Sequence, residues 1–454
     1  MRCAEMVSAK RESLVTFATL WKVDAPWSGC HQTVAMHADH RPMQAPTTPS
    51  SGVRDPQPAH RSLRVAMVTE TYAPEVNGVA LTLARLVDGL RQRQHVVQLV
   101  RPLQHGADQP ALGGSLREVL TNGMRIPMYG SLRMGLPAGR ELVRLWRAER
   151  PDIVHIATEG PLGWSALQAA RKLKLPVCSD FRTNFHAYSQ FYGLAWLQKP
   201  IVAYLRTFHN RCDASMVPTE VLREQLAAIG FERLSVVARG VDTDLFSPAR
   251  RSCALRHQWG ASDDDLVVLH VGRLAPEKNL DALLQAFERL RSAHPRVKLV
   301  IVGDGPSRQQ LQSRCPGALF AGFRSGVDLA THYASSDVFL FPSLTETYGN
   351  VTPEAMASGL GVVAFNDAAA GQLIQHGFDG MLAPKGDAAA FSQLACAMAG
   401  DAERCRAMGR RAREGTAALG WERIVRRIEE TYAIVMAKSR SPELALAWLS
   451  HQRG

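Results

Sequence analysis

The stretch Asp337-Val-Phe-Leu-Phe-Pro-Ser-Leu-Thr-Glu-Thr-Tyr-Gly-Asn-Val-Thr-Pro-Glu-Ala-Met-Ala-Ser-Gly359 contains a strand, a loop and a helix in one run. Its first part, residues 337–342, is a short apolar segment ending in proline, which is typical of a buried strand. Pro353 suits the first position of a helix and Thr352 suits the N-cap before it, so we expect a helix over 353–359. A buried strand followed directly by a helix is the repeating unit of a parallel sheet covered by helices.

The same pattern recurs along most of the chain. Further strands are predicted at 63–69, 95–100, 152–156, 176–180, 214–217, 266–271, 298–302, near 320 and at 362–365. Helices are predicted over 80–92 and 280–291, and an amphipathic helix over 421–436 closes the series. This alternation indicates an α/β protein with two Rossmann-like halves, each built on a parallel sheet. We expect ligands in the cleft where the carboxyl ends of both sets of strands face each other.

The length of 454 residues exceeds what one hydrophobic core supports and fits two domains. The N-terminal segment lacks sustained periodicity and ends in the linker-like Ala45-Pro-Thr-Thr-Pro-Ser-Ser51. The predicted division is a disordered or mis-assigned extension over 1–60, an N-terminal domain over 61–238, a C-terminal domain over 239–420, and a closing helix and tail over 421–454.

Composition narrows the classes of protein. The chain is 46% hydrophobic, yet no apolar run approaches the roughly 20 residues that span a bilayer, which indicates a soluble protein. Its 8 cysteines are scattered without a CxxC motif, which predicts reduced, cytosolic thiols rather than a disulfide framework or a zinc site. A net charge of +11 favours anionic partners, with nucleotide diphosphates and phospholipid headgroups ahead of nucleic acid because no nucleic-acid module is present.

Two glutamates frame the loop and the helix start in the opening stretch. A diphosphate could lie against the backbone of Gly349, Asn350 and Val351, at the unpaired amides of the helix start. Glu354 would then be near enough to bind a pair of sugar hydroxyls, and Glu346 lies farther out at the mouth of the loop. The alternative is a solvent-facing loop acid and a first-turn acid that the helix dipole favours. The small residues after Glu354 let the helix approach a ligand closely, and the combination predicts a nucleotide-sugar site.

A second motif, Gly272-Arg-Leu-Ala-Pro-Glu-Lys278, follows the predicted strand at 266–271. Arg273 offers a planar fork of donors and Lys278 a point charge, and this pairing suits a diphosphate. An ordinary basic turn is the alternative. The predicted phosphate-binding helix in the same half favours the functional interpretation, with the Gly272 backbone close to the ligand.

Glycines also follow strands elsewhere in the chain. Gly78 ends the first loop of the N-terminal half, where it would let the backbone approach a phosphate or a sugar. A plain turn is the alternative, since the full GxGxxG pattern is missing. For Gly303-Asp-Gly305 the turn is the favoured interpretation.

The segment Phe181-Arg-Thr-Asn-Phe-His-Ala-Tyr188 follows a predicted strand of the first half, so it should face the cleft. Arg182 and His186 are therefore candidates for substrate contact, although a single histidine is more often part of a core or a loop. Two acidic runs, Asp242-Thr-Asp244 in the connector and Asp263-Asp-Asp265 before a strand, are interpreted as structural. We assign no metal ligand.

Four of these motifs together resemble the retaining glycosyltransferases of family 4, which have the two-domain GT-B fold. They are Gly272-Arg…Lys278, Glu346-x7-Glu354, Gly240-Val-Asp-Thr-Asp-Leu-Phe246 and the loop ending at Gly78, and the likeness spans roughly residues 63 to 437. Among subgroups the chain is most similar to bacterial mannosyltransferases that use GDP-mannose. The GT-B resemblance implies that the closing helix packs back on the N-terminal domain.

By this resemblance the protein is a hexosyltransferase that acts on lipid-linked or glycan hydroxyls. Arg273 and Lys278 would neutralise the leaving diphosphate, Glu354 would hold the ribose, and Glu346 would contact the donor sugar. Such enzymes need no metal or other cofactor, since two cations and a helix dipole supply the charge. Retention in the family is attributed to front-face attack, with the leaving phosphate oxygen helping to accept the acceptor proton.

One position departs from the family pattern. A histidine beside the donor sugar is common where this chain has Arg182, and His186 lies four residues later. A nucleotide-sugar-binding protein without transferase activity, or a transferase that uses UDP-sugars, is therefore an alternative. A dinucleotide-dependent oxidoreductase fits less well because its glycine fingerprint is incomplete.

Two segments, Ser131–Arg150 and Tyr192–Arg211, mix Leu, Trp and Tyr with basic residues, as interfacial helices do. Ordinary helices with solvated basic faces are an equally good interpretation. The expected location is the cytoplasm, with peripheral association at the inner face of the cytoplasmic membrane as a further expectation.

Overall fold

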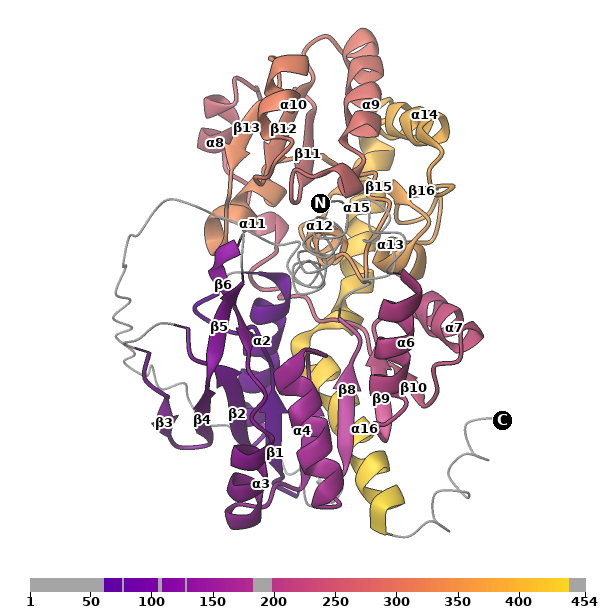
Figure 1. Cartoon of the computed structure of the whole chain (residues 1–454). Coiled ribbons are helices and arrows are strands. Elements are labelled where there is room, and N and C mark those ends of the chain that lie inside the picture. Colours follow the sequence, from indigo (N-terminus) through magenta and orange to yellow (C-terminus); the bar gives the residue numbers. More distant parts are fainter. Residues whose placement is uncertain (1–60, 76, 105–107, 127–128, 183–197, 441–454) are drawn as a thin grey trace, which may run out of the picture.

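The computed structural model describes residues 61–75, 77–104, 108–126, 129–182 and 198–440. The predictions made for residues 1–60 and for His186 lie outside these ranges. Two bodies of sheet and helix, one from each half of the chain, lie one above the other, and a long helix near the end of the chain starts at their junction and runs along the first body (Figure 1).

The first sheet has eight strands in the order β10-β9-β8-β7-β1-β2-β4-β3, and every neighbouring pair is parallel except β3 with β4. The strands of this half are β1 (Arg64–Val68), β2 (Val96–Pro102), β3 (Leu112–Gly113), β4 (Leu116–Thr121), β7 (Ile153–Ile156), β8 (Val177–Asp180), β9 (Ala214–Val217) and β10 (Leu234–Val236), with a separate antiparallel hairpin of β5 (Gly123–Ile126) and β6 (Tyr129–Gly135). The helices are α2 (Gly78–Gln92), α3 (Gly139–Ala148), α4 (Pro161–Lys172), α6 (Gln198–His209) and α7 (Glu220–Ala228). Because β1 lies between β2 and β7, the loop that follows β1 opens at the middle of the sheet edge.

The second sheet has six parallel strands in the order β13-β12-β11-β14-β15-β16. They are β11 (Val267–Val271), β12 (Lys298–Val302), β13 (Leu319–Gly322), β14 (Val338–Phe341), β15 (Gly361–Phe365) and β16 (Met381–Ala383). The helices are η3 (Pro248–Arg250), α8 (Cys253–Gln258), η4 (Pro276–Lys278), α9 (Leu280–Ala293), α10 (Arg308–Arg314), α11 (Gly326–Ala334), α12 (Val351–Ala357), α13 (Ala368–Leu373), α14 (Ala388–Ala399), α15 (Ala402–Thr416), η5 (Ala417–Leu419) and α16 (Trp421–Arg440). Since β11 and β14 are neighbours, the loops that follow them meet at the carboxyl edge. These two parallel sheets confirm the predicted α/β architecture.

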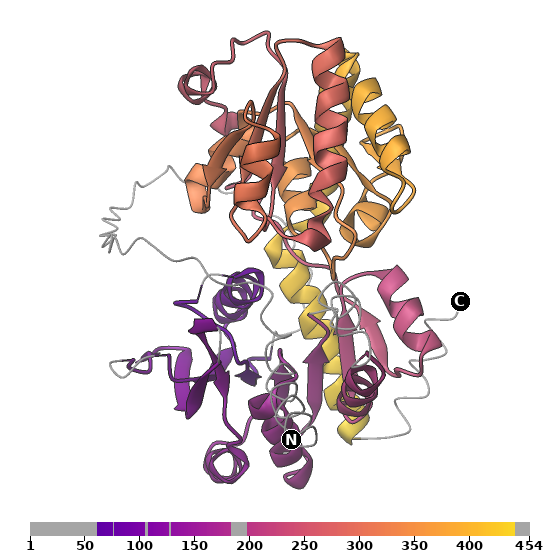
Figure 2. The ribbon, with the colours of Figure 1, turned by 45° about the horizontal axis from the view of Figure 1, so that its top comes forward.

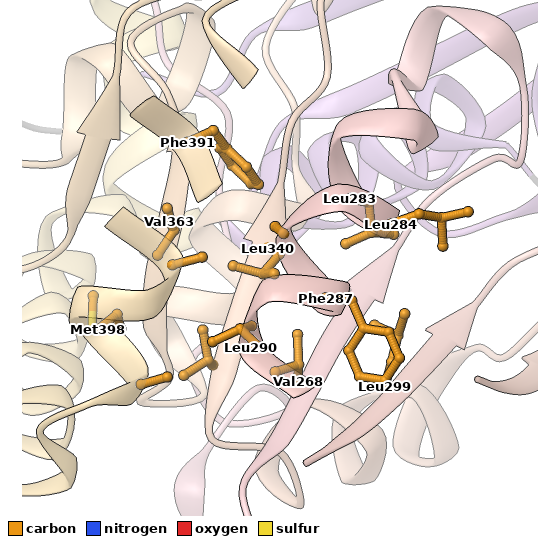
Figure 3. Packing of buried hydrophobic residues seen from close by; sticks show 14 of the residues in the cluster. Val268, Leu283, Leu284, Phe287, Leu290, Leu299, Leu340, Val363, Phe391 and Met398 are labelled. Atoms are coloured by element: carbon orange, nitrogen blue, oxygen red, sulfur yellow. The ribbon is translucent and has the colours of Figure 1, made fainter. Parts of the chain in front are cut away.

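Apolar periodicity explains how helices cover the second sheet. Leu283, Phe287 and Leu290 lie at the spacing of one helical face of α9 and are buried against Val268 of β11 and the neighbouring strands (Figure 3). Burying each such side chain contributes about 2 kcal/mol relative to exposure. The sheet edge that carries the loops therefore rests on a rigid core.

Helix α16 packs back on the first sheet, as predicted. Ile424, Val425 and Ile428 of α16 are buried in the same hydrophobic cluster as the first-sheet strands. The contact with α2 is close, because a Cβ built on Gly89 would lie 2.5 Å from Val425 Cγ2. The helix starts between the two bodies and continues along the N-terminal one (Figure 2), so it ties the end of the chain to the first half.

Within the described ranges the chain passes between the two bodies twice, and these two crossings lie side by side. In the connector after β10, the Val241 amide donates to the Leu419 carbonyl at 3.0 Å. A Cβ on Gly240 would lie 2.6 Å from the Trp421 ring, so only glycine lets α16 begin this close to the connector. The two crossings therefore form one joint.

The two segments predicted as possible interfacial helices have mainly structural roles where they are described. Residues 131–135 belong to the strand β6 and not to a helix, and α3 begins only at Gly139. The apolar side chains Leu142 and Trp146 of α3, and Ile201 and Phe208 of α6, point into the core. Within the described ranges, no helix combines the length and the apolar character that crossing a membrane requires. The exposed surface of α3 carries the basic residues Arg140, Arg144 and Arg147.

The described cysteines are free thiols, and most are buried. They are Cys178, Cys212, Cys253, Cys315, Cys396 and Cys405.

Candidate functional site

The loops after β11 and β14 are joined at the carboxyl edge of the second sheet. The Leu344 amide donates to the Glu277 carbonyl at 3.1 Å. The first loop contains Arg273 and Lys278, and the second contains Glu346. The fold thus brings together the two motifs that the sequence analysis singled out separately.

Lys278 and Glu346 form an ion pair across these loops. Their side chains are 13% and 14% exposed, and the Ser343 hydroxyl also donates to Glu346 Oε1 at 2.8 Å. The Lys278 ammonium lies 5.7 Å from the centre of the Phe341 ring, within range of a cation–π contact. A ligand entering here would meet an ammonium and a carboxylate that are already positioned.

Arg273 lies on the inner side of the same loop. Its Nη1 is 3.9 Å from Glu277 Oε1 and, within the described residues, has no hydrogen-bond partner although it is buried. A guanidinium carries five N–H donors in a fixed fork, so this side chain keeps donors for an oxyanion.

The helix after Glu346 begins two residues earlier than predicted. The N-cap is Asn350 rather than Thr352, and α12 starts at Val351. The reason is Gly349, whose φ of +86° turns the chain sharply so that its carbonyl already accepts the Thr352 amide at 3.0 Å. With only seven residues, α12 is short, so the cations are the stronger candidates for holding a diphosphate.

The carboxylate of Glu354 is fixed by a hydrogen bond from Tyr333 of α11. The Tyr333 hydroxyl donates to Glu354 Oε2 at 3.0 Å, and its ring is completely buried. Burial raises the pKa of Glu354 to about 7, even though the Tyr333 hydrogen bond lowers it. The carboxyl group therefore has a fixed position and titrates near neutral pH.

His270, which the sequence analysis did not single out, lies inside the same edge. Its Nδ1 is 3.0 Å from the Leu340 carbonyl, and because a carbonyl only accepts, Nδ1 carries the proton. Burial lowers its pKa to about 4, so the ring is neutral near pH 7. Its ring stacks on Phe341, at 6.1 Å between centroids, and Phe341 is the ring that the Lys278 ammonium contacts.

Gly303 and Gly305 serve as structural turns beside the Gly272 loop. A Cβ on Gly303 would lie 1.9 Å from the Gly272 carbonyl, and one on Gly305 would lie 2.4 Å from the Leu274 carbonyl. The backbone of the β12 loop therefore packs directly behind the loop that carries Arg273.

At the edge of the first sheet, Gly78 is the first residue of α2. The Asn77 side chain caps this helix by accepting from the Ala80 amide at 2.8 Å. Outside its own helix and its chain neighbours, no atom of the described residues lies within 4 Å of the position that a Gly78 Cβ would take. Packing among the described residues therefore leaves room for a larger side chain at this position. The close approach of a ligand stays a prediction from the sequence.

Arg182 belongs to a chain of buried polar groups that crosses the first sheet. It pairs with Asp180 at the end of β8, and His155 Nε2 of β7 lies 3.0 Å from the same Asp180 oxygen. His155 Nδ1 is in turn 2.7 Å from the Tyr432 hydroxyl of α16. Burial raises the pKa of Asp180, but Arg182 and His155 together hold it well below its usual range.

Arg239, in the connector, lies between the two sheet edges. It donates to the Arg182 carbonyl at 3.2 Å and lies 5.9 Å from the centre of the Tyr348 ring, while the Tyr348 hydroxyl donates to the Arg239 carbonyl at 3.3 Å. Tyr348 belongs to the loop that begins at Glu346, so Arg239 connects both walls of the cleft.

The two acidic runs have structural partners. Asp242 pairs with Arg85 at 2.6 Å and accepts the Leu245 amide, and Asp265 accepts the Ser262 amide at 2.8 Å in a turn. Across the described residues, no cluster of three or more His, Cys, Asp or Glu side chains is arranged to hold a metal ion.

Comparison with known proteins follows the division into two halves. A model described as glycosyltransferase family 4 matches residues 76–245, and one described as glycosyl transferases group 1 matches residues 265–401. A GDP-mannose-dependent alpha-mannosyltransferase of Mycobacterium tuberculosis is 36% identical over 333 residues, which are 72% of this chain and 85% of that protein. The chain belongs to glycosyltransferase family 4.

Other comparisons extend this result. A GDP-mannose-dependent alpha-(1-6)-phosphatidylinositol dimannoside mannosyltransferase of Mycobacterium tuberculosis is 29% identical over 69% of this chain and 82% of its own. Sucrose-phosphate synthase from Thermosynechococcus elongatus superposes with a TM-score of 0.67 at 18% identity, covering 83% of this chain and 100% of that chain. The fold of this family 4 glycosyltransferase is GT-B.

The predicted candidates of the glycosyltransferase fall into two groups. Arg273, Lys278, Glu346 and Glu354 lie along the edge of the second sheet, whereas Gly78 and Arg182 lie on the first sheet. Glu346 pairs with Lys278 on the second sheet, and Arg182 pairs with Asp180 on the first.

The sequence motifs did not predict three further residues that lie at or next to the site, Arg239, Tyr333 and His270. Arg239 directly precedes the Gly240–Phe246 motif, and its charge at a domain junction was the signal. Tyr333 and His270 gave no local signal, because their partners are distant in sequence.

Proposed function

We propose that the protein transfers a mannosyl unit from GDP-mannose to a hydroxyl of a lipid-linked or glycan acceptor, with retention of the anomeric configuration. The observation that carries the proposal is the meeting of Arg273, Lys278 and Glu346 where the loops after β11 and β14 join. The names of relatives that use GDP-mannose support the donor, and the relative that acts on a phosphatidylinositol mannoside supports a lipid-linked acceptor.

In this proposal the nucleotide half of the donor lies along the second sheet. Arg273 and Lys278 bind the diphosphate, whose negative charge grows as the glycosidic bond breaks. The backbone of Gly272 and of residues 349–351 lies against the same phosphates. Glu354 accepts from the ribose hydroxyls, and Tyr333 keeps its carboxylate in place.

The sugar half of the donor lies toward the first sheet. Glu346 contacts the mannosyl unit beside the Lys278 ammonium. Gly78 lets the opposite wall approach the sugar, and Arg182 belongs to that wall. Domain closure would exclude water from the reacting centre.

The proposal requires no metal ion, because two cationic side chains stand where the diphosphate charge develops. Transfer should therefore continue in the presence of excess EDTA. Loss of activity that added magnesium restores would contradict this part of the proposal.

We further propose that the enzyme works in the cytoplasm, at the inner face of the membrane. The exposed face of α3 carries Arg140, Arg144 and Arg147, which suits anionic headgroups. Flotation with vesicles that contain anionic lipid tests this step. A protein that stays at the bottom with both anionic and neutral vesicles would contradict it.

A donor screen tests the main proposal. GDP-mannose should raise the melting temperature more than UDP-glucose, UDP-galactose or UDP-N-acetylglucosamine, and labelled mannose should appear in a membrane-lipid or glycan acceptor. Stabilisation by a UDP-sugar alone would favour a different donor. Binding of GDP-mannose without transfer or hydrolysis across an acceptor panel would favour a binding protein.

A further inference from the structure

The Arg239 guanidinium has no carboxylate partner among the described residues. Its contacts are the Arg182 carbonyl at 3.2 Å and the face of the Tyr348 ring. Burial and the neighbouring charge of Arg182 lower its pKa to about 10. No ion pair joins Arg239 to the carboxylates of Asp180 and Glu346, which act on it only from a distance, so part of its desolvation cost is left for a bound anion to offset.

Arg182, next to Arg239, has a hydrogen-bond donor that no described residue uses. One arm of its guanidinium is committed to Asp180, but its Nε is buried and has no hydrogen-bond partner among the described residues. The single carboxylate of Asp180 is shared further with His155. Asp180, which also acts on Arg239, is therefore already occupied by Arg182 and His155.

Both arginines line the same hollow. Its other charged wall residue is Asp180, and most of the remaining wall is apolar, with Pro218, Val237 and Trp421 among its members. In a hollow with this charge imbalance and few polar groups, an oxyanion would interact strongly with the fork of each arginine.

We infer that Arg182 and Arg239 form a second anion site, separate from the diphosphate cations, which binds a phosphate or carboxylate carried by the acceptor. The inference rests on the proposed transfer reaction. It assigns Arg239 to the choice of acceptor, because a charged acceptor would be held next to the transferred sugar while a neutral one would lose this contact.

The arrangement favours the acceptor over the donor as the source of the anion. The donor cations Arg273 and Lys278 belong to the loop after β11, and each already lies beside a carboxylate of the second half. Arg182 instead ends a strand of the first half, and Arg239 belongs to the connector. The anion would therefore lie on the N-terminal side of Tyr348, away from the diphosphate.

Arg239→Gln is the variant that tests the inference, since removing Arg182 would leave Asp180 unpaired and could impair folding. Arg410→Gln removes the same charge from an exposed position on α15. Transfer to octyl glucuronide is compared with transfer to octyl glucoside, which carries a hydroxymethyl group in place of the carboxylate. The wild type and Arg410→Gln should prefer the charged acceptor, and Arg239→Gln should lose about 10-fold or more of that preference.

A binding measurement separates the acceptor from the donor and does not depend on turnover. Inorganic phosphate is titrated by calorimetry into enzyme saturated with GDP, in which the diphosphate cations are occupied. Phosphate should bind the wild type and bind Arg239→Gln about 10-fold more weakly, while GDP affinity stays within about twofold because the donor cations are untouched. Arg239→Lys should fall between, because it keeps the charge but loses the fork.

Three results would overturn the inference: equal losses with both acceptors, no phosphate binding to the GDP-saturated wild type, or GDP affinity that falls together with phosphate affinity. If GDP does not bind the wild type at all, the proposed function fails instead. A circular dichroism melt of each variant shows that the fold is retained.

Discussion

Lys278 with Glu346 and Arg182 with Asp180 are both cation–carboxylate pairs at the carboxyl edge of a parallel sheet, one in each half of the molecule. Lys278 and Glu346 come from two neighbouring loops and keep 13% and 14% of their side-chain surface exposed. Asp180 is tied through a fully buried histidine to α16. We therefore expect the pair at the edge of the second sheet (the second edge) to exchange partners with a ligand, whereas the Asp180 carboxylate at the edge of the first sheet (the first edge) helps to hold the fold together.

The largest expected effect is on turnover, at the second edge. Glu346→Ala removes a carboxylate that contacts the transferred sugar, so kcat should fall about 10²- to 10³-fold, the cost of deleting one preorganised electrostatic group. Because the pair is only 13% and 14% exposed, the free energy of unfolding should also fall, by about 2 kcal/mol, which is less than at the first sheet, where the carboxylate also holds a histidine. Steady-state kinetics and urea unfolding measure the two quantities, and Glu403→Ala, at an exposed ion pair, is the control. Unchanged turnover would contradict the site assignment.

At the first edge the main expected effect is on stability. Asp180→Ala leaves the Arg182 guanidinium without its counter-charge, so the free energy of unfolding should fall by about 3 kcal/mol. Glu430→Ala removes the exposed partner of Arg427 and should cost under about 1 kcal/mol. Urea unfolding checks both variants. If Asp180→Ala is as stable as Glu430→Ala, the contrast between the two edges does not hold.

A smaller effect is expected from the group that supports the second edge. Tyr333→Phe deletes the hydrogen bond to Glu354, worth about 1 kcal/mol, so the Kd for GDP should rise about fivefold with little change in kcat. Calorimetry with GDP measures the first quantity and initial rates measure the second. A fall in kcat with unchanged GDP affinity would show that Tyr333 acts on the sugar instead.

The last expected effect is on the pH dependence of stability. Burial raises the pKa of Glu354 from 4.5 to about 7, so the folded protein holds this proton more tightly than the unfolded chain. Its stabilising contribution is complete below the unfolded pKa and is lost as the pH rises through about 7.

Glu354→Gln cannot lose this proton, so it tests the pH dependence directly. The variant should gain stability relative to the wild type between about pH 5 and about pH 8 in urea unfolding. A stability difference that is the same at both pH values would contradict the raised pKa.

The sequence predicted the second edge better than the first, for a physical reason. Arg273, Lys278, Glu346 and Glu354 lie in loops that follow continuous apolar strands, and neighbouring parallel strands bring such loops together. The helix start was predicted two residues late, because the left-handed turn at Gly349 cannot be read from a proline and a threonine.

The first edge depends on contacts between distant residues. Asp180 and Arg182 are neighbours in sequence, but His155 meets a tyrosine 277 residues away, and nothing local indicates that contact. The residues 131–135 likewise form a strand because their hairpin partner is β5.

The hydrogen bond between Val241 and Leu419, with Trp421 packed on Gly240, has a mechanical consequence. Two chain crossings that lie together leave one rotation axis, whereas separate crossings would resist bending or allow shear. When the two bodies rotate about that axis, points near it move little and points at the cleft mouth travel farthest. Arg239 and Tyr348 lie close to the axis, so the distance between them would stay nearly constant during domain closure. Gly78 would instead move toward the second sheet.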